Sequence, residues 1–372
     1  MSEPGSGRDE KLDRVGKIID AAIVTAPDPS PVDPDSVDPD SVDPDWGVPG
    51  VVAAAGRGPT TLSTWVAGHA DTTPGETRPM RADTVFDLAS LTKVVATTTI
   101  TLALAGRGDL ALDERAGHYL PAATWDVTLR QLLSHTSGLP SIGTFYESCS
   151  SREEVLRALF ATPLEAPPGT RVAYSDLGFM TLAEIATAVT GTPLDVLFRD
   201  LVAKPLGLAE TGYLPQAASD RFAATERRPD GTPWSGIVHD ENARAMGGVA
   251  GHAGLFGTAA DLGRFAAWWV GPGDGPVPAE LRREAESDQT VGLDGNRGLG
   301  WTLIGDRYDI LGPAWPPTSV SHTGFTGTSI ALAPASGAWV VLLTNNVHFG
   351  RGRPAIRKLR SDVYTAAAAA LF

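Results

Sequence analysis

The order of strand-like and helix-like segments is the feature that most constrains the fold of this 372-residue chain. Two segments near the start, Val48–Ala55 and Thr61–Gly68, have the composition of strands and are joined by a Gly-Arg-Gly-Pro turn. Helical patterns then dominate from about residue 88 to residue 270, and short strand-like segments return after Gly298. Early and late strands therefore have to share one sheet. We expect an α+β protein in which an antiparallel sheet is flanked by helices and an all-helical region packs beside it.

The expected late strands and helices follow from the same patterns. Strands are predicted over Gly300–Ile304, Val320–His322, Thr328–Ala333 and Ala338–Thr344. Helices are predicted over Leu91–Ala105, Leu129–Leu133, Arg152–Phe160, Leu177–Val189, Leu194–Val202, Ala259–Trp269 and Pro354–Leu371. The space between the sheet and the helical region is the expected place for a site.

The chain divides at about residue 45. Residues 8–24 carry apolar side chains at helical spacing, which predicts an amphipathic helix. From Val32 the unit Val-Asp-Pro-Asp-Ser recurs, and a segment this rich in proline and acid has almost nothing to bury. We interpret residues 1–45 as a helix and a disordered acidic tether. Residues 46–372 form the expected hydrolase domain, with a sheet part from 46–88 and 296–372 and a helical part from 89–295.

Charge and composition exclude several partners and cofactors. The net charge is -14, but residues 1–45 alone hold twelve acidic and four basic residues, so the body of the chain is only mildly acidic. This argues against nucleic acid as a partner. No apolar run reaches eighteen residues, and the N-terminus has no apolar leader segment, so we expect no membrane span and a cytoplasmic location. The single cysteine, Cys149, allows no disulfide and no cysteine metal cluster.

A candidate nucleophile and base lie one helical turn apart at Ser90 and Lys93. Ser90 falls between an extended stretch and the predicted helix Leu91–Ala105, so free amides and the helix dipole favour negative charge on its oxygen. A lysine of ordinary pKa is protonated at neutral pH. Burial in an apolar helix favours loss of that proton, which would make Lys93 a base for Ser90. The pair alone also fits a capping serine and a surface lysine.

Tyr174 is the candidate proton relay. It follows the turn Pro167–Thr170, and Ser175 or Asp176 is expected to cap the next helix. A nearby lysine cation would make the phenol of Tyr174 easier to deprotonate, so that it can take the serine proton and return it to the leaving group.

The third fragment is His322-Thr323-Gly324, at the end of a predicted strand. A strand that ends in glycine gives a ligand close access to the backbone. The amide of the next residue, Phe325, is expected to join the amide of Ser90 as an oxyanion donor. We expect His322, Thr323, Gly324 and Asp176 to contact the substrate.

Together these fragments resemble the serine β-lactamase and penicillin-binding-protein superfamily, in its class C β-lactamase, D-alanyl-D-alanine carboxypeptidase and family VIII esterase branch. The resemblance extends from Trp46 to the C-terminus. Besides the three fragments it includes Phe86–Lys93, Leu132–Leu139, Pro168-Gly169, and His239–Ala243 with the glycine-rich run Gly247–Gly257. It implies a mixed sheet flanked by helices, with an acylated Ser90 between sheet and helical region and with Lys93 and Tyr174 as its bases.

Two positions depart from the pattern of this superfamily. The second motif normally ends in asparagine, where this chain has Asp176, and the third normally begins with lysine, where it has His322. A mostly neutral imidazole binds a substrate carboxylate more weakly than a lysine does. Efficient β-lactam hydrolysis is therefore not expected.

The remaining histidines and Asp240 are not expected to take part in catalysis. We expect His135 to bond backbone, and the irregular spacing of His239, Asp240 and His252 suits no standard metal site. Asp240 is an alternative lining residue for the space near Gly248–Gly254. The chain has no Gly-x-Ser-x-Gly, His-Glu-x-x-His or Walker A motif, and we expect neither metal nor cofactor.

The expected function is that of a serine hydrolase acting on a small-molecule ester through an acyl-Ser90 intermediate. Three alternatives stay open: an acyltransferase that passes the acyl group to an amine or alcohol of a specialised metabolite, a β-lactamase or DD-peptidase that cleaves an amide, and a non-catalytic relative.

Overall fold

The sheet of this protein joins the two ends of the chain. The computed structural model describes residues 6–24, 47–273, 275–352 and 354–372; the expected tether and its Val-Asp-Pro-Asp-Ser repeat lie outside them. Seven antiparallel strands follow the order β3-β2-β1-β10-β9-β8-β7, so the early and late strands meet at β1 and β10, as the sequence predicts. Their bounds are β1 Gly50–Arg57, β2 Thr60–Asp71, β3 Arg78–Pro79, β7 Thr302–Leu303, β8 Val320–Thr323, β9 Ser329–Ala333 and β10 Ala338–Thr344.

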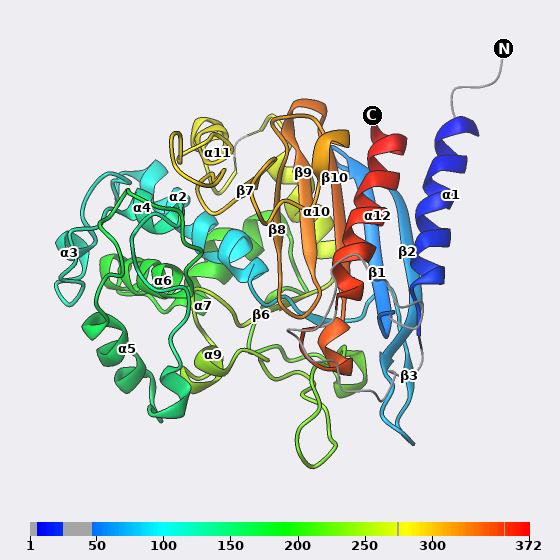
Figure 1. Cartoon of the computed structure of the whole chain (residues 1–372), viewed down its shortest axis with the longest axis horizontal. Helices are drawn as coiled ribbons and strands as arrows, with labels where there is room; N and C mark the ends of the chain where they lie inside the picture. Colours follow the sequence, from blue (N-terminus) through cyan, green and yellow to red (C-terminus); the bar gives the residue numbers. More distant parts are fainter. Residues whose placement is uncertain (1–5, 25–46, 274, 353) are drawn as a thin grey trace.

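Both faces of the sheet are covered, and strand alternation decides which side chain goes where. In β1, Val51 and Ala53 face the terminal helices α1 (Ser6–Ala21) and α12 (Ala355–Leu371), whereas Val52 faces the larger core on the opposite side. The helix α10 (Ala259–Trp269) packs on that opposite side against β1 and β10. Figure 1 shows α1 and α12 next to the sheet, α10 behind the strands, and the other labelled helices gathered to the left of the sheet.

The helical region is built around α6 (Asp176–Thr190), whose first half is almost entirely buried. The other α-helices are α2 Thr99–Arg107, α3 Ala116–Tyr119, α4 Leu129–Leu133, α5 Arg152–Ala161, α7 Leu194–Phe198, α8 Lys204–Leu206, α9 Glu241–Ala245 and α11 Ala279–Ala285. Short 3₁₀ turns are η2 Phe145–Glu147, η4 Ser219–Arg221, η5 Gly312–Ala314, η6 Pro334–Ser336 and η7 Asn346–Phe349.

Two predicted helices contain wider turns than the sequence pattern indicates. Leu91–Ala105 contains the π-helix η1 (Lys93–Thr98) before α2, and Leu194–Val202 passes from α7 into the π-helix η3 (Arg199–Ala203). In the first, the Thr99 hydroxyl donates to the carbonyl of Val94, five residues earlier. Isolated π-turns of this kind are frequent at functional sites. The predicted strand Gly300–Ile304 is also shorter, because only Thr302–Leu303 pairs with β8.

A small second sheet connects the main sheet to the helical region. Its strands are β4 Phe86–Asp87, β6 Leu255–Gly257 and β5 Gly212–Tyr213, in that order. β4 leads directly to Ser90, and β6 follows the glycine-rich run after α9. The two segments are thus brought together immediately before the candidate nucleophile.

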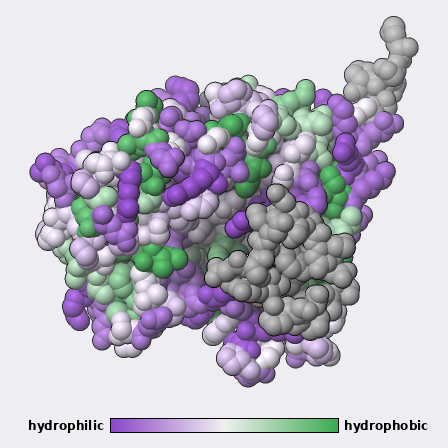
Figure 2. All heavy atoms as spheres, viewed as in Figure 1, coloured by the Kyte–Doolittle hydropathy of each residue, from purple (hydrophilic) through white to green (hydrophobic). Residues whose placement is uncertain are grey.

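The described residues include no helix long and apolar enough to cross a membrane. On the face of the molecule shown in Figure 2, hydrophobic residues form small patches separated by hydrophilic ones.

Candidate active site

Ser90 is presented by a strained turn between β4 and the following helix. Ala89 has φ +47°, a left-handed conformation that costs a residue with a side chain about 1–2 kcal/mol. The carboxylate of Asp87 supports this turn by accepting hydrogen bonds from the amides of Ala89 (2.9 Å) and His239 (2.7 Å). Helical residues begin at Leu91, so Ser90 lies at a helix start as predicted. The supporting role of Asp87 was missed, although an aspartate two residues before a strained turn is a recognisable signal.

Lys93 is fully buried, and its ammonium group has three acceptors. The Nζ atom lies 2.9 Å from Ser90 Oγ, 3.1 Å from the carbonyl oxygen of His252 and 2.7 Å from Asp176 Oδ1. The first two contacts are hydrogen bonds donated by the ammonium, and the third is an ion pair. The Lys93–Ser90 approach agrees with the spacing argument. The pairing with Asp176, 83 positions away, was not anticipated.

The expectation that burial deprotonates Lys93 is wrong. Burial alone lowers the pKa of Lys93, but attraction to Asp176 and Tyr174 outweighs it and raises the pKa above its ordinary value. In the resting protein the Lys93 amine is therefore a cation that lies within reach of both Ser90 and Asp176.

Tyr174 lies against the same lysine. The Lys93 Nζ atom is 5.0 Å from the centre of the Tyr174 ring, and the ring packs on His135 with centroids 4.6 Å apart. Burial raises the pKa of Tyr174 and the Asp176 charge adds to this, whereas Lys93 and a hydrogen bond to Ser90 act in the opposite direction. The net pKa is raised. The expectation of an easily ionised phenol is therefore wrong, and Tyr174 rests as a neutral proton donor.

His135 and Ser175 fix the backbone around Tyr174. The Ser175 amide donates to His135 Nδ1 at 3.0 Å, and Ala173 donates to the His135 carbonyl at 2.8 Å, so His135 bonds backbone as expected. Ser175 is the cap of α6 and accepts from Gly178 at 3.4 Å.

His322, on β8, lies near Tyr174. Its Nδ1 atom donates to the Thr323 carbonyl at 2.9 Å, which leaves Nε2 as the unprotonated nitrogen. This Nε2 atom is buried and has no hydrogen-bond partner among the described residues. Burial, assisted by the Lys93 and Arg297 charges, lowers the pKa of His322 well below 6.5. His322 is therefore a neutral side chain beside Tyr174, with ring centroids 6.2 Å apart.

Two backbone amides near Ser90 are free to bind an anion. Within the described residues, neither the amide of Ser90 nor that of Phe325 donates a hydrogen bond to the protein. Unpaired amides are rare in folded proteins. The Phe325 side chain is 55% exposed, and its ring stacks on His239 with the ring centroids 5.6 Å apart. Thr323, the last residue of β8, pairs with Ser329 of β9. Gly324 has no space for a side chain, since a Cβ atom would lie 2.1 Å from Thr328 Oγ1.

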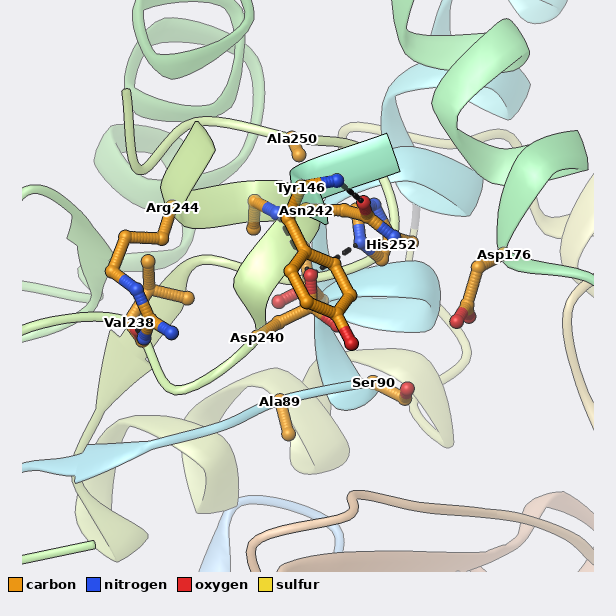
Figure 3. Close-up of polar contacts among 12 residues, drawn as sticks. Ala89, Ser90, Tyr146, Asp176, Val238, Asp240, Asn242, Arg244, Ala250 and His252 are labelled. Atoms are coloured by element: carbon orange, nitrogen blue, oxygen red, sulfur yellow. Dashed lines mark hydrogen bonds and ion pairs between the residues drawn. The ribbon is translucent and has the colours of Figure 1, made fainter. Parts of the chain in front are cut away.

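The remaining histidine and acid candidates form two pairs. His252 Nε2 lies 2.8 Å from Asp240 Oδ1, and His239 Nε2 lies 3.0 Å from Glu226 Oε2. Figure 3 shows the first pair, with Ser90 and Asp176 coming from separate segments nearby. No group of three or more side chains suited to a metal occurs in the part of the chain that the structure describes. The His252 carbonyl contact to Lys93 was missed, because a backbone acceptor leaves no mark in the sequence.

Comparison with known proteins identifies the family. The β-lactamase family model matches residues 40–365. The chain belongs to the β-lactamase family. This membership agrees with the resemblance of the sequence motifs. Because the family consists of serine hydrolases and acyl-transfer enzymes, membership supports an enzymatic role.

Two curated relatives are identical to this chain at about a third of the aligned positions. An N-acetylmuramyl-L-alanine amidase of Bacillus subtilis is 33% identical, over 72% of this chain and 69% of the relative. A protein of Escherichia coli named as a D-alanyl-D-alanine carboxypeptidase is also 33% identical, over 73% of this chain and 71% of the relative.

Solved structures of similar fold support the α+β architecture. A penicillin-binding-protein homologue from Caulobacter crescentus has a TM-score of 0.73 at 20% identity, covering 97% of this chain and 98% of the other. EstCE1, named as a hydrolase with promiscuous acyltransferase activity, has a TM-score of 0.72 at 22% identity, covering 96% and 99%. The simvastatin synthase LovD from Aspergillus terreus has a TM-score of 0.71 at 19% identity, covering 87% and 94%.

Proposed function

We propose that this protein is a serine esterase that cleaves a neutral small-molecule ester through an acyl-Ser90 intermediate. The observation that carries the proposal is the row Ser90 Oγ, Lys93 Nζ, Asp176 Oδ1, with separations of 2.9 and 2.7 Å. The row connects a serine hydroxyl to a carboxylate through a single ammonium group. It lies next to two amides without acceptors, at Ser90 and Phe325.

Acylation begins with attack of Ser90 Oγ on the ester carbonyl. As the bond to carbon forms, the Ser90 proton passes to Lys93 Nζ, and Lys93 passes one of its own protons to Asp176 Oδ1. Lys93 thereby remains a cation beside the developing oxyanion, and the Ser90 and Phe325 amides donate to that oxyanion. This route uses the protonated Lys93 that the resting structure favours, and it replaces a free amine as the base.

Collapse of the tetrahedral intermediate expels an alkoxide, which takes the phenolic proton of Tyr174. Lys93 then returns a proton to Tyr174, and Asp176 returns one to Lys93, so the starting charges are restored. Water repeats the sequence on the acyl ester and releases the carboxylic acid. The Nε2 lone pair of His322 is available on the Tyr174 side to accept a hydrogen bond from the alcohol or water.

The preference for a neutral ester rests on how the nearby cations are paired. Lys93 is paired with Asp176, Arg297 with Asp306 at 2.9 Å, and Arg351 with Glu226 and Glu241. A substrate carboxylate would have to compete with these acids for the three cations. The guanidinium of Arg360, which has no carboxylate partner among the described residues, is already bonded to the Gly324 and Thr328 carbonyls. The neutral His322 adds no charge to attract a substrate carboxylate.

Two alternatives remain as proposals with their own support. Acyl transfer to an amine or alcohol is supported by the similarity to EstCE1 and LovD, whose names describe acyltransferase and synthase activities. Cleavage of an amide, as by a peptidase or β-lactamase, is supported by the 33% identical relatives named as an amidase and a carboxypeptidase. The cytoplasmic location expected from the N-terminal sequence stays a prediction.

Rapid mixing with p-nitrophenyl acetate tests the esterase proposal. We expect a burst of nitrophenol equal to the enzyme concentration, a mass gain of one acetyl group on Ser90, and neither signal in Ser90→Ala. Added amines and alcohols, a D-Ala-D-Ala peptide and nitrocefin distinguish hydrolysis from transfer, peptidase and β-lactamase activity. Absence of both burst and label in folded wild-type protein would overturn the proposal.

A further inference from the structure

The peptide unit between Gly324 and Phe325 has a second half that the proposed mechanism leaves unused. Its N–H is the proposed oxyanion donor of Phe325, and its C=O belongs to Gly324. The two groups lie in one rigid plane and point in opposite directions, so a contact that fixes the carbonyl also fixes the direction of the amide. The contacts of the Gly324 oxygen therefore bear on the geometry of the oxyanion site, and the inference below rests on the proposed function.

The Gly324 oxygen is held by an arginine of the C-terminal helix. Arg360 Nη2, on α12, donates to the Gly324 carbonyl at 3.0 Å and to the Thr328 carbonyl at 2.8 Å. The same turn is closed internally, because Gly324 N donates to Thr328 O at 2.7 Å and Gly327 N donates to Gly324 O at 3.1 Å. Arg360 thus joins both ends of the turn between β8 and β9.

Two threonines attach this turn to the segment that carries Ser90. Thr326 Oγ1 donates to the Asp87 carbonyl at 2.8 Å, and Thr328 Oγ1 donates to the Leu88 carbonyl at 3.0 Å. The relative position of the Ser90 and Phe325 amides is therefore set by direct bonds across the two segments. Arg360 holds the side of the turn that faces away from the substrate.

Arg360 is half-buried, and its guanidinium bonds two backbone carbonyls. Its Nε atom is buried without a hydrogen-bond partner, and no carboxylate lies within ion-pair distance of it in the part of the chain that the structure describes. Burial lowers the pKa of Arg360 to about 10, so the group is still a cation at neutral pH. Withdrawing part of this cation from water has a free-energy cost, which the two carbonyl acceptors offset.

We propose that Arg360 is a positioning residue for the oxyanion site: its guanidinium fixes and polarises the Gly324–Phe325 peptide so that the Phe325 amide points at the reacting carbonyl. A cation on the carbonyl oxygen draws electron density from the peptide and makes its N–H a stronger donor. Arg360 therefore acts through Phe325 and does not touch the substrate.

The test compares Arg360→Met, which keeps most of the length but no charge, with Arg360→Lys, which keeps the charge. Arg357→Met, an exposed arginine on the same helix, is the matched control. Removing one oxyanion donor costs about 10²–10³ in kcat, so weakening one is expected to lower the acylation rate of p-nitrophenyl acetate about 10–100-fold in Arg360→Met. KM should change less than the rate, and Arg360→Lys should restore part of it.

A spectroscopic measurement separates this role from a loss of stability. The infrared band of the acyl-Ser90 ester carbonyl moves to higher wavenumber when its hydrogen bonds weaken. We expect that movement in Arg360→Met, a smaller one in Arg360→Lys and none in Arg357→Met, with circular dichroism confirming folded protein in each case. If Arg360→Met does not fold, Arg360→Gln, which keeps an N–H donor but no charge, takes its place: a wild-type rate and band in that variant overturn the inference.

The outcomes distinguish this inference from the proposed function. If the wild type acylates and Arg360→Met matches it in rate and carbonyl band, the positioning role is wrong and the esterase proposal stands. If the wild type forms no acyl-Ser90, both are wrong.

Discussion

Replacing Asp176 by asparagine tests whether the Lys93–Asp176 pair controls the protonation of the site. The asparagine side chain would keep an oxygen acceptor at nearly the same position and would remove only the charge. Lys93 has no exposed surface, and its Nζ atom lies 2.7 Å from the Asp176 carboxylate. Without that carboxylate, burial becomes the dominant influence and the pKa of Lys93 should fall below its ordinary value.

The magnitude is bounded from two directions. Removing one partner of a buried ion pair typically costs about 3–5 kcal/mol. The cost has a ceiling, because Lys93 can lose its proton instead. At pH 7, about 3.4 pH units below the ordinary lysine pKa, that loss costs about 4.6 kcal/mol. We therefore expect Asp176→Asn to lower the free energy of unfolding by about 3–4.6 kcal/mol at pH 7.

The free energy of unfolding should change with pH differently in the wild type and in Asp176→Asn. In the wild type the folded pKa of Lys93 is raised, so its stabilising contribution is fully present below about pH 10.4, the ordinary lysine pKa, and is lost only as pH rises through the higher folded value. In Asp176→Asn the folded pKa lies below the unfolded one, so unfolding takes up a proton and stability rises with pH. The slope approaches about 1.4 kcal/mol per pH unit in the window between the lowered folded pKa and the ordinary lysine pKa of about 10.4.

Urea unfolding at pH 7, 8, 9 and 10 measures both quantities. Wild type and variant share every titrating group except Asp176, so the pH dependence of the difference between their unfolding free energies between pH 7 and 10 reports on Lys93. Asp362→Asn is the control, since it breaks the exposed Lys358–Asp362 pair on α12 and should cost less than about 1 kcal/mol at any pH. A deficit of Asp176→Asn that stays constant from pH 7 to 10 would refute the reasoning.

Three further predictions concern the chemistry and stability of the site region. Tyr174→Phe should lower kcat about 10²–10⁴-fold for alkyl esters and much less for nitrophenyl esters, whose leaving group needs no proton; equal losses would contradict the donor role. The profile of kcat/KM against pH should show no inflection between pH 6 and 7 from His322, because burial and the Lys93 charge lower its pKa well below 6.5; an inflection that disappears in His322→Gln would contradict this. Burial raises the pKa of Glu286, which accepts from Trp269 Nε1 at 2.8 Å, to about 7. Because the folded protein then binds this proton more tightly, stability should fall as pH rises from about 4 to 7, and Glu286→Gln should stabilise by about 1–3 kcal/mol at pH 8 and by almost nothing at pH 4 in urea unfolding.

The sheet could be predicted from the sequence because its strands carry their own pattern. Segments such as Val48–Ala55 and Ala338–Thr344 are apolar, β-branched and bounded by turn residues, and the main sheet follows from pairing the early with the late ones. The type of helix at each position could not be predicted. The π-helix at Lys93–Thr98 depends on hydrogen bonds within a buried, threonine-rich segment, and periodicity cannot distinguish it from an α-helix.

The candidate site could be predicted only where its residues lie close together in the sequence. Ser90 and Lys93 share a helical turn, so their spacing alone places them together. The pairing of Lys93 with Asp176 depends on how α6 packs, and it reversed the expected pKa shift of the lysine. Arg360 lies in the run Arg-Lys-Leu-Arg-Ser-Asp, which has the composition of an ordinary helix surface. Only the fold places its guanidinium beneath the turn after β8.

Intact-protein mass spectrometry after rapid quenching of p-nitrophenyl acetate turnover tests the central claim most directly. The account predicts a transient gain of one acetyl group per chain, located by peptide mapping on Ser90, absent in Ser90→Ala and accumulating more slowly in Arg360→Met. Turnover of the ester by folded wild-type protein without any acylated species, or acylation that persists in Ser90→Ala, would contradict it.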